Sequence, residues 1–187
     1  MIKCLICGYI IREEIADKNK EAIPFANSKQ NIKYCPFCGV DEKWLVESDD
    51  RLLGDKLELN DETLKIINHA MKLEVFNGDF YKEASELCLN KENKSFFKSL
   101  SNIEYTHAQV HRRLCKEKRT PSLTSLNYEK FRGKDELLLD EALKREEHAI
   151  NYYKRYYDKV CNDEVRTIFK ILSKVEEDHI YLASSKK

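Results

Sequence analysis

A set of five residue positions occurs twice in this chain, and the second copy lies 72 residues after the first. In each copy an alanine precedes a glutamate by four residues, a tyrosine follows that glutamate by seven, and Glu-x-x-His begins 30 residues after it. Residues that only cover a surface have no reason to share this register, so the repeat constrains the architecture. The copies are Ala70, Glu74, Tyr81, Glu104 and His107, and Ala142, Glu146, Tyr153, Glu176 and His179.

Each copy spans two segments with helical periodicity. Apolar residues recur every three or four positions, and the chain has only five glycines and three prolines. We expect helices over about 61–90, 94–118, 134–160 and 163–184, the first capped by Asn60 or Asp61. Pro121 would end the second helix, and 119–133 would be a long connection. Two short turns around one long crossover predict a mainly α, four-helix bundle.

The repeat supplies four carboxylates and two imidazoles. Residues three apart on a helix project from nearly the same face, so each Glu-x-x-His can place both side chains on the bundle axis. This ligand set is that of known di-iron and di-manganese carboxylate bundles, and the alternative is a network of ion pairs. We expect two metal ions, with the two single glutamates as terminal ligands and those of the Glu-x-x-His pairs as bridges. The predicted catalytic and metal-binding residues are Glu74, Glu104, His107, Glu146, Glu176 and His179.

Tyr81 and Tyr153 each lie about two helical turns after a predicted ligand. Each can donate a hydrogen bond to a carboxylate of the opposite helical hairpin and so support a ligand. The alternative is that both are ordinary core aromatics. His111 lies one turn beyond His107, and we expect it outside the site.

Four of the seven cysteines form two C-x-x-C pairs near the N-terminus: Cys4, Cys7, Cys35 and Cys38. Four thiolates at this spacing suit a mononuclear tetrahedral site for iron or zinc. Residues 1–44 would form a small rubredoxin-like or zinc-ribbon β module, 45–60 a linker and 61–184 the bundle. We expect the isolated cysteines, Cys88, Cys115 and Cys161, to be small apolar core residues.

Composition indicates which partners and which cellular location to expect. Lys plus Arg and Asp plus Glu both number 33, so no basic surface for nucleic acid is indicated. No apolar run is long enough to span a membrane, and the first residues lack the apolar segment of a signal peptide. We therefore expect a cytoplasmic protein with neither nucleic acid nor membrane as a partner.

The segments CLICGYI and CPFCG resemble a rubredoxin-type module, and the duplicated ligand set resembles that of the rubrerythrins, in the ferritin-like superfamily. The resemblance covers nearly the whole chain except the linker, and the module precedes the bundle as in the reverse rubrerythrins. It implies an Fe(Cys)4 centre that passes electrons to two iron ions, which reduce hydrogen peroxide or dioxygen. It also implies an NAD(P)H-linked reductase as electron donor, acting directly or through a rubredoxin. Family members commonly form homodimers in which one subunit's module lies near the other's di-iron site.

The chain departs from this family in two places. Peroxide-reducing rubrerythrins typically carry a further glutamate three residues after the third-helix ligand, where this chain has Ala149. The 27 residues between the cysteine pairs also exceed the usual spacing, so we expect a longer, charged insertion within 11–33. An alternative function is therefore a ferritin-like iron-handling protein or ferroxidase without peroxidase turnover. A third is a zinc-ribbon bundle with an interaction role, which the duplicated ligands disfavour.

Overall fold

The computed structural model describes residues 1–28, 31–47 and 50–187. Residues 29–30 of the segment between the cysteine pairs, and 48–49 of the expected linker, lie outside the described residues.

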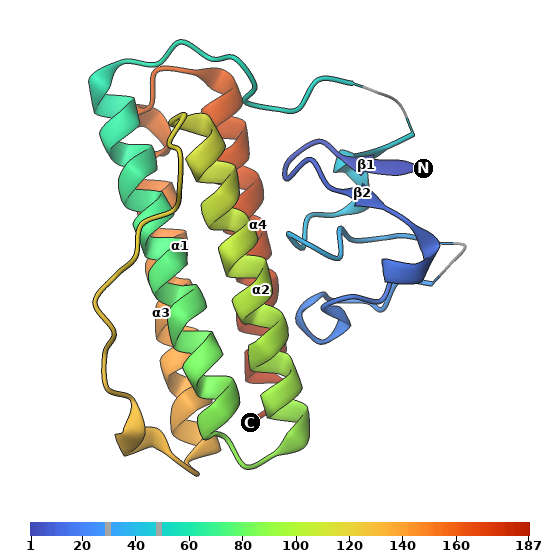
Figure 1. Ribbon diagram of the computed structural model, residues 1–187, viewed down its shortest axis with the longest axis vertical. Helices are drawn as coiled ribbons and strands as arrows, with labels where there is room; N and C mark the ends of the chain where they lie inside the picture. Colours follow the sequence, from blue (N-terminus) through green and yellow to red (C-terminus); the bar gives the residue numbers. More distant parts are fainter. Residues whose placement is uncertain (29–30, 48–49) are drawn as a thin grey trace.

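Four long helices follow a small β module, which confirms the predicted mainly α architecture (Figure 1). Three of the helices begin at an asparagine whose side-chain oxygen accepts hydrogen bonds from the first turn: Asn60, Asn90 and Asn162. The helices are α1 (Asp61–Leu87), α2 (Lys91–Leu114), α3 (Asp135–Tyr156) and α4 (Asp163–Ser184).

The helices form two antiparallel hairpins, α1 with α2 and α3 with α4, as Figure 1 shows. The segment between α2 and α3 crosses the full length of the bundle, so the predicted single long crossover is confirmed. Asp135 at the start of α3 accepts hydrogen bonds from the backbone N–H groups of Leu89 and Asn90. This contact ties the end of the crossover to the turn between α1 and α2.

The helix ends differ from the predicted ends by a few residues. α1 stops at Leu87 because Asn90 caps α2, which moves the turn and the start of α2 toward the N-terminus. α2 stops at Leu114, and the next residues include Lys116 with φ of 56°, a conformation that ends a helix. α3 gives way to a 3-10 turn after Tyr156.

The N-terminal module is a three-stranded antiparallel sheet in the order β2-β1-β3. Ile2 of β1 lies opposite Ile11, and Lys3 lies opposite both Ile10 and Val46. The strands are β1 (Ile2–Cys4), β2 (Ile10–Ile11) and β3 (Leu45–Val46). The 3-10 helices are η1 (Glu13–Ile15), η2 (Lys20–Ala22), η3 (Glu42–Trp44), η4 (Glu129–Phe131) and η5 (Tyr157–Lys159).

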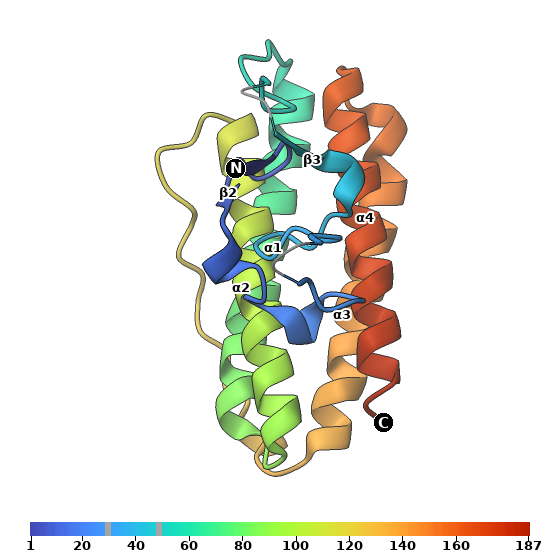
Figure 2. The same ribbon diagram turned by 90° about the vertical axis from the view of Figure 1, so that its right-hand side faces the viewer.

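The module lies across α2 and α4, and its buried residues join those of the bundle in one continuous core (Figure 2). Arg113 of α2 donates to the backbone oxygens of Ile6 and Leu53, at 2.8 and 2.9 Å. Glu164 of α4 accepts from the backbone N–H of Gly54 at 2.7 Å. Both helices are thus bonded to the module or to the segment that follows it.

Gly39 lets the second cysteine turn pack closely against α4. Its φ is 73°, and a Cβ built on it would lie 2.8 Å from Cγ1 of Val175. We expect Gly39→Ala to lower the free energy of unfolding by about 2–4 kcal/mol, through left-handed strain and overpacking. The matched control is Gly133→Ala: its φ is 70°, but its Cβ would meet only Leu89 at an ordinary 3.4 Å. Urea denaturation should show a loss of about 1 kcal/mol there, and equal losses in the two variants would contradict close packing at Gly39.

Of the three isolated cysteines, one lies outside the core. Cys88 is buried and Cys115 is half-buried, but Cys161 is exposed, so the core prediction was wrong for Cys161. Cys161 lies in the turn before the Asn162 cap, and its backbone N–H donates to Thr63 Oγ1. None of the helices among the described residues is long and apolar enough to cross a membrane.

Candidate metal centre

All six repeat ligands lie on the axis of the bundle and are essentially inaccessible to solvent. Each helix carries the predicted ligands that the repeat places within its residue range. Glu74 comes from α1, Glu104 and His107 from α2, Glu146 from α3, and Glu176 and His179 from α4.

The six side chains fall into two overlapping groups of four, within each of which the ligand atoms lie no more than 4.8 Å apart. One group contains Glu74 and His107, and the other contains Glu146 and His179. Glu104 and Glu176 belong to both groups. This is the arrangement expected when two glutamates bridge two ions and each ion also has one terminal carboxylate and one imidazole.

The two imidazoles present equivalent nitrogens to the carboxylates. His107 Nδ1 lies 3.1 Å from Glu176 Oε1, and His179 Nδ1 lies 2.9 Å from Glu176 Oε2 and 3.2 Å from Glu104 Oε1. The rings are nearly parallel, with an angle of 17° and centroids 6.3 Å apart. Nδ1 is therefore the metal-facing atom of both histidines.

The polar atoms of this cluster lack the hydrogen bonds that buried groups normally make. Both oxygens of Glu104 and Glu176, one each of Glu74 and Glu146, Nδ1 of both histidines and Nε2 of His179 form no hydrogen bond, although both Nδ1 atoms lie within 3.1 Å of carboxylate oxygens. Each such atom costs about 1–3 kcal/mol when it is buried without compensation. Cations between the carboxylates would satisfy these atoms together, so the residues fit a pair of metal ions.

In the absence of metal, burial and neighbouring charges shift the pKa values of the cluster residues. Burial raises the pKa of Glu146 to about 7, and burial together with the charge of Glu176 raises that of Glu104 well above its usual range. Burial also opposes ionisation of Glu176, but His107 and His179 outweigh it and lower that pKa to about 2. The carboxylates beside the histidines overcome burial and raise the pKa of both imidazoles.

Both repeat tyrosines make the hydrogen bonds that the sequence suggested. Tyr81 of α1 donates to Glu146 of α3, and Tyr153 of α3 donates to Glu74 of α1. Each bond joins one hairpin to the other, and each holds one oxygen of a cluster carboxylate in place.

His111 contacts this site, contrary to our expectation. It is fully buried, with Nε2 2.8 Å from the Tyr153 hydroxyl and 3.8 Å from Glu74 Oε1. Because Tyr153 donates its only proton to Glu74, His111 Nε2–H donates to Tyr153. The sequence signal was the four-residue step from His107, which places both rings on one face of α2. His111 is not part of the repeat, because the corresponding residue of the second copy is Ala183.

The asymmetry at His111 predicts unequal effects of removing the two tyrosine hydroxyls. Tyr153→Phe leaves both His111 and Glu74 without a partner, whereas Tyr81→Phe leaves only Glu146. We expect Tyr153→Phe to reduce the stability of the metal-free protein by about 1–3 kcal/mol more than Tyr81→Phe. Urea denaturation of the two variants measures this difference. Equal losses would show that the His111 contact adds nothing.

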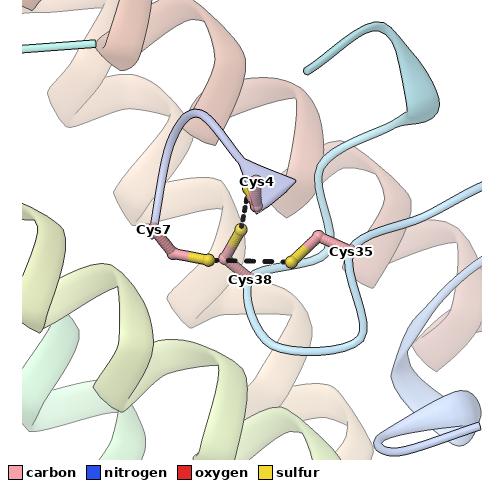
Figure 3. A group of neighbouring side chains, drawn as sticks. All are labelled: Cys4, Cys7, Cys35 and Cys38. Atoms are coloured by element: carbon pink, nitrogen blue, oxygen red, sulfur yellow. Dashed lines mark hydrogen bonds between the residues drawn. The ribbon is translucent and has the colours of Figure 1, made fainter. Parts of the chain in front are cut away.

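The four paired cysteines converge from two turns of the module, and Figure 3 shows their sulfurs directed at a common centre. Sγ of Cys4 lies 3.6 Å from that of Cys38, and Sγ of Cys7 lies 3.6 Å from that of Cys35. A tetrahedral ion with metal–sulfur bonds of about 2.3 Å separates its sulfurs by about 3.8 Å. The sulfurs are thus spaced for one metal ion.

Burial makes thiolates costly at this centre in the absence of metal. It raises the pKa of Cys35 and Cys38 well above the usual range. For Cys4 the neighbouring thiols outweigh burial and lower the pKa. A bound cation would stabilise all four thiolates, and its identity, iron or zinc, is not set by this geometry.

One hydrogen bond connects the two clusters within the same chain. His107 Nε2 lies 2.9 Å from the backbone oxygen of Cys38, and both residues are fully buried. The ring donates through Nε2 to a cysteine of one cluster and presents Nδ1 to the other. Within this chain, the cysteine module therefore lies directly against the carboxylate and histidine cluster.

No family model, curated protein or solved structure matches this chain. The residues themselves support a four-helix bundle with a buried carboxylate and histidine cluster and a four-cysteine module. Ala149, which occupies the position where peroxide-reducing rubrerythrins typically carry a further glutamate, is fully buried.

Proposed function

We propose that this protein is a rubrerythrin-like, non-haem di-iron oxidoreductase that reduces hydrogen peroxide, or secondarily dioxygen. In this proposal the carboxylate and histidine cluster holds two iron ions, and the four cysteines hold one. An NAD(P)H-linked reductase, directly or through a rubredoxin, supplies the electrons.

The observation that carries this proposal is the hydrogen bond between His107 and Cys38. A structural zinc site or an iron store does not require a bonded contact between its two metal clusters. An electron-transfer protein does benefit, because the contact gives a covalent and hydrogen-bonded route from thiolate to imidazole. Since the route lies within one chain, a homodimer would not be needed to form it.

The chain's own residues have distinct tasks in this reaction. Glu104 and Glu176 would hold both ions, and Glu74 and Glu146 would hold one ion each, with their carboxylates fixed by hydrogen bonds from Tyr153 and Tyr81. When bound, the iron pair supplies the two electrons that break the O–O bond. Hydrogen peroxide then takes up two electrons and two protons and becomes two water molecules.

Iron handling is the second candidate, and Ala149 favours it. A buried alanine provides no additional carboxylate next to Glu146, so the site stays closer to the symmetric ferroxidase type. The cysteine module disfavours it, because oxidation of ferrous iron requires no electron donor.

Anaerobic stopped-flow spectroscopy separates the two candidates. Iron-loaded protein is reduced and mixed with hydrogen peroxide, and the visible absorbance of both centres is followed. A peroxidase should reoxidise both centres, with two electrons per peroxide, and should turn over when reductant is present. Zinc-loaded protein is the redox-silent control. Uptake and oxidation of added Fe(II) without catalytic loss of peroxide would favour iron handling, and a four-cysteine site that retains only zinc would refute the electron route.

A further inference from the structure

A groove of about 730 Å³ lies between the cysteine module and α4. Its lining includes Gly39 and Val40 of the second cysteine turn and Val175 of α4. Gly39 directly follows Cys38, and Val175 directly precedes Glu176. A molecule bound in this groove would therefore contact the sequence neighbours of Cys38, in the cysteine cluster, and of Glu176, in the carboxylate and histidine cluster.

Aromatic rings line this groove. Two of them are strongly exposed: Phe25 at 67% and Tyr181 at 69%. Large exposed aromatic side chains around a concave site are typical of binding surfaces, and the volume is that of a site for a cofactor-sized molecule. The ring-bearing residues are Phe25, Tyr34, Trp44, Tyr157 and Tyr181. Together they favour a planar aromatic ligand.

The charged residues of the groove leave cations available for a ligand. Lys174 is 3.4 Å from Asp178, and Asp41 accepts from the backbone of Lys43, so both acids already have partners. The Lys43 ammonium lies over the Trp44 ring, 5.4 Å from its centroid. Among the residues that the structure describes, Lys170 of α4 is a lysine of this groove whose side chain makes neither a hydrogen bond nor an ion pair. These lysines favour an anionic group on the ligand.

We propose that this groove binds a flavin mononucleotide and is the entry point for electrons. The isoalloxazine ring would stack among the aromatic side chains, and the phosphate would lie at Lys170 and Lys43. The reduced flavin gives up two electrons and two protons and becomes oxidised flavin, while hydrogen peroxide accepts the same number and becomes two water molecules. The direction of electron flow rests on the proposed function, but binding does not.

Binding is tested with oxidised flavin mononucleotide and the full-length, zinc-loaded protein at low ionic strength. Trp44 is the chain's single tryptophan, so a flavin bound in the groove should quench its fluorescence at a one-to-one ratio. Lys170→Ala should weaken binding about tenfold, because it removes a charge-assisted contact to the phosphate. Lys144→Ala, an exposed lysine of α3 outside the groove, is the matched control and should bind normally.

Riboflavin, which lacks the phosphate, distinguishes ring recognition from charge. It should bind about tenfold more weakly than flavin mononucleotide, and Lys170→Ala should leave its affinity unchanged. Absence of quenching, equal affinity for both flavins, or equal affinity of the Lys170 and Lys144 variants would overturn the proposal. Loss of electron uptake from a protein donor in Lys170→Ala, with no flavin binding, would also overturn it and would identify a protein-docking surface.

The same variants separate this inference from the proposed function. Flavin binding that depends on Lys170, in a protein that does not consume peroxide, would support the groove and refute the peroxidase. Peroxide turnover without flavin binding would support the peroxidase and refute the flavin site. With iron in the cysteine site, photoreduced flavin mononucleotide should bleach that centre at least several-fold more slowly in Lys170→Ala than in Lys144→Ala at subsaturating flavin. Equal rates would contradict electron entry through the groove.

Discussion

Glu104→Met and Glu176→Met should both abolish the dinuclear site, but they should change the stability of the metal-free protein in opposite directions. Without metal, four buried carboxyl groups face two imidazoles, so the carboxyl groups cannot all ionise together without a large cost. Burial and Glu176 raise the pKa of Glu104, which means that its charged form is disfavoured where it lies. Replacing it by an apolar residue of similar volume should stabilise the metal-free protein by about 1–4 kcal/mol.

Glu176 has the opposite balance. His107 and His179 outweigh burial and lower its pKa to about 2, so its charge is favoured in the folded state. Its removal leaves both imidazoles without their nearest carboxylate and should cost about 3–5 kcal/mol. Glu147→Met, on the exposed side of α3 next to a ligand, is the control and should change neither property.

Elemental analysis after iron loading and chemical denaturation after chelation measure the two properties separately. Loss of metal with stability changes of opposite sign supports the ligand assignment. Retention of two metal ions per chain by either variant would refute it. Loss of stability in both would show that the carboxylates are favourable ion-pair partners and not an excess of buried charge.

The metal-free protein should lose stability as the pH rises from about 4.5 to 7. The pKa of Glu146 is raised in the folded state to about 7 from an ordinary 4.5, so the folded state binds the extra proton. Its contribution is fully present below pH 4.5 and is lost as the pH passes through about 7; the shift corresponds to about 3 kcal/mol. The raised pKa of His179 acts in the same direction, with stability lost as the pH rises through it.

Glu176 acts in the opposite direction at lower pH. Because its pKa is lowered to about 2, its contribution is present above pH 4.5 and is lost as the pH falls toward 2. The metal-free protein should therefore be most stable near pH 4.5. The metal-loaded protein should behave differently, because protons displace metal from carboxylate and imidazole ligands.

Thermal unfolding of both forms between pH 3 and 8 measures this contrast. The midpoint of the metal-free protein should fall from pH 4.5 to 7, and that of the metal-loaded protein should rise. Glu146→Gln should flatten the metal-free profile. Parallel profiles with and without metal would contradict a metal-binding role for these carboxylates.

The repeat was sufficient to predict which side chains meet on the bundle axis, because equal spacing within two hairpins fixes equal positions along antiparallel helices. It also predicted the cross-hairpin bonds of Tyr81 and Tyr153. It failed at His111, because reasoning from symmetry overlooks a residue that only one copy contains. The buried Nε2 of His111 nevertheless contacts the same carboxylate as Tyr153 does.

Features set by tertiary packing were less accessible to sequence reasoning. Cys161 is exposed because it lies in the turn before the Asn162 cap. The exact helix ends likewise depend on which residue caps the next helix. The contact between Cys38 and His107 requires the module to lie across α2 and α4 of its own chain. No local sequence pattern specifies how the module packs on the bundle. The importance of Gly39 for this packing is evident only from its close approach to Val175 in the structure.

Anomalous diffraction from crystals of the iron-loaded protein tests the central claim most directly. We predict two peaks between the bridging carboxylates of Glu104 and Glu176, each next to Nδ1 of one histidine, and one peak among the four cysteine sulfurs. A single peak at the cysteines, with no anomalous scatterer within the carboxylate cluster of protein prepared anaerobically with excess iron, would contradict the account.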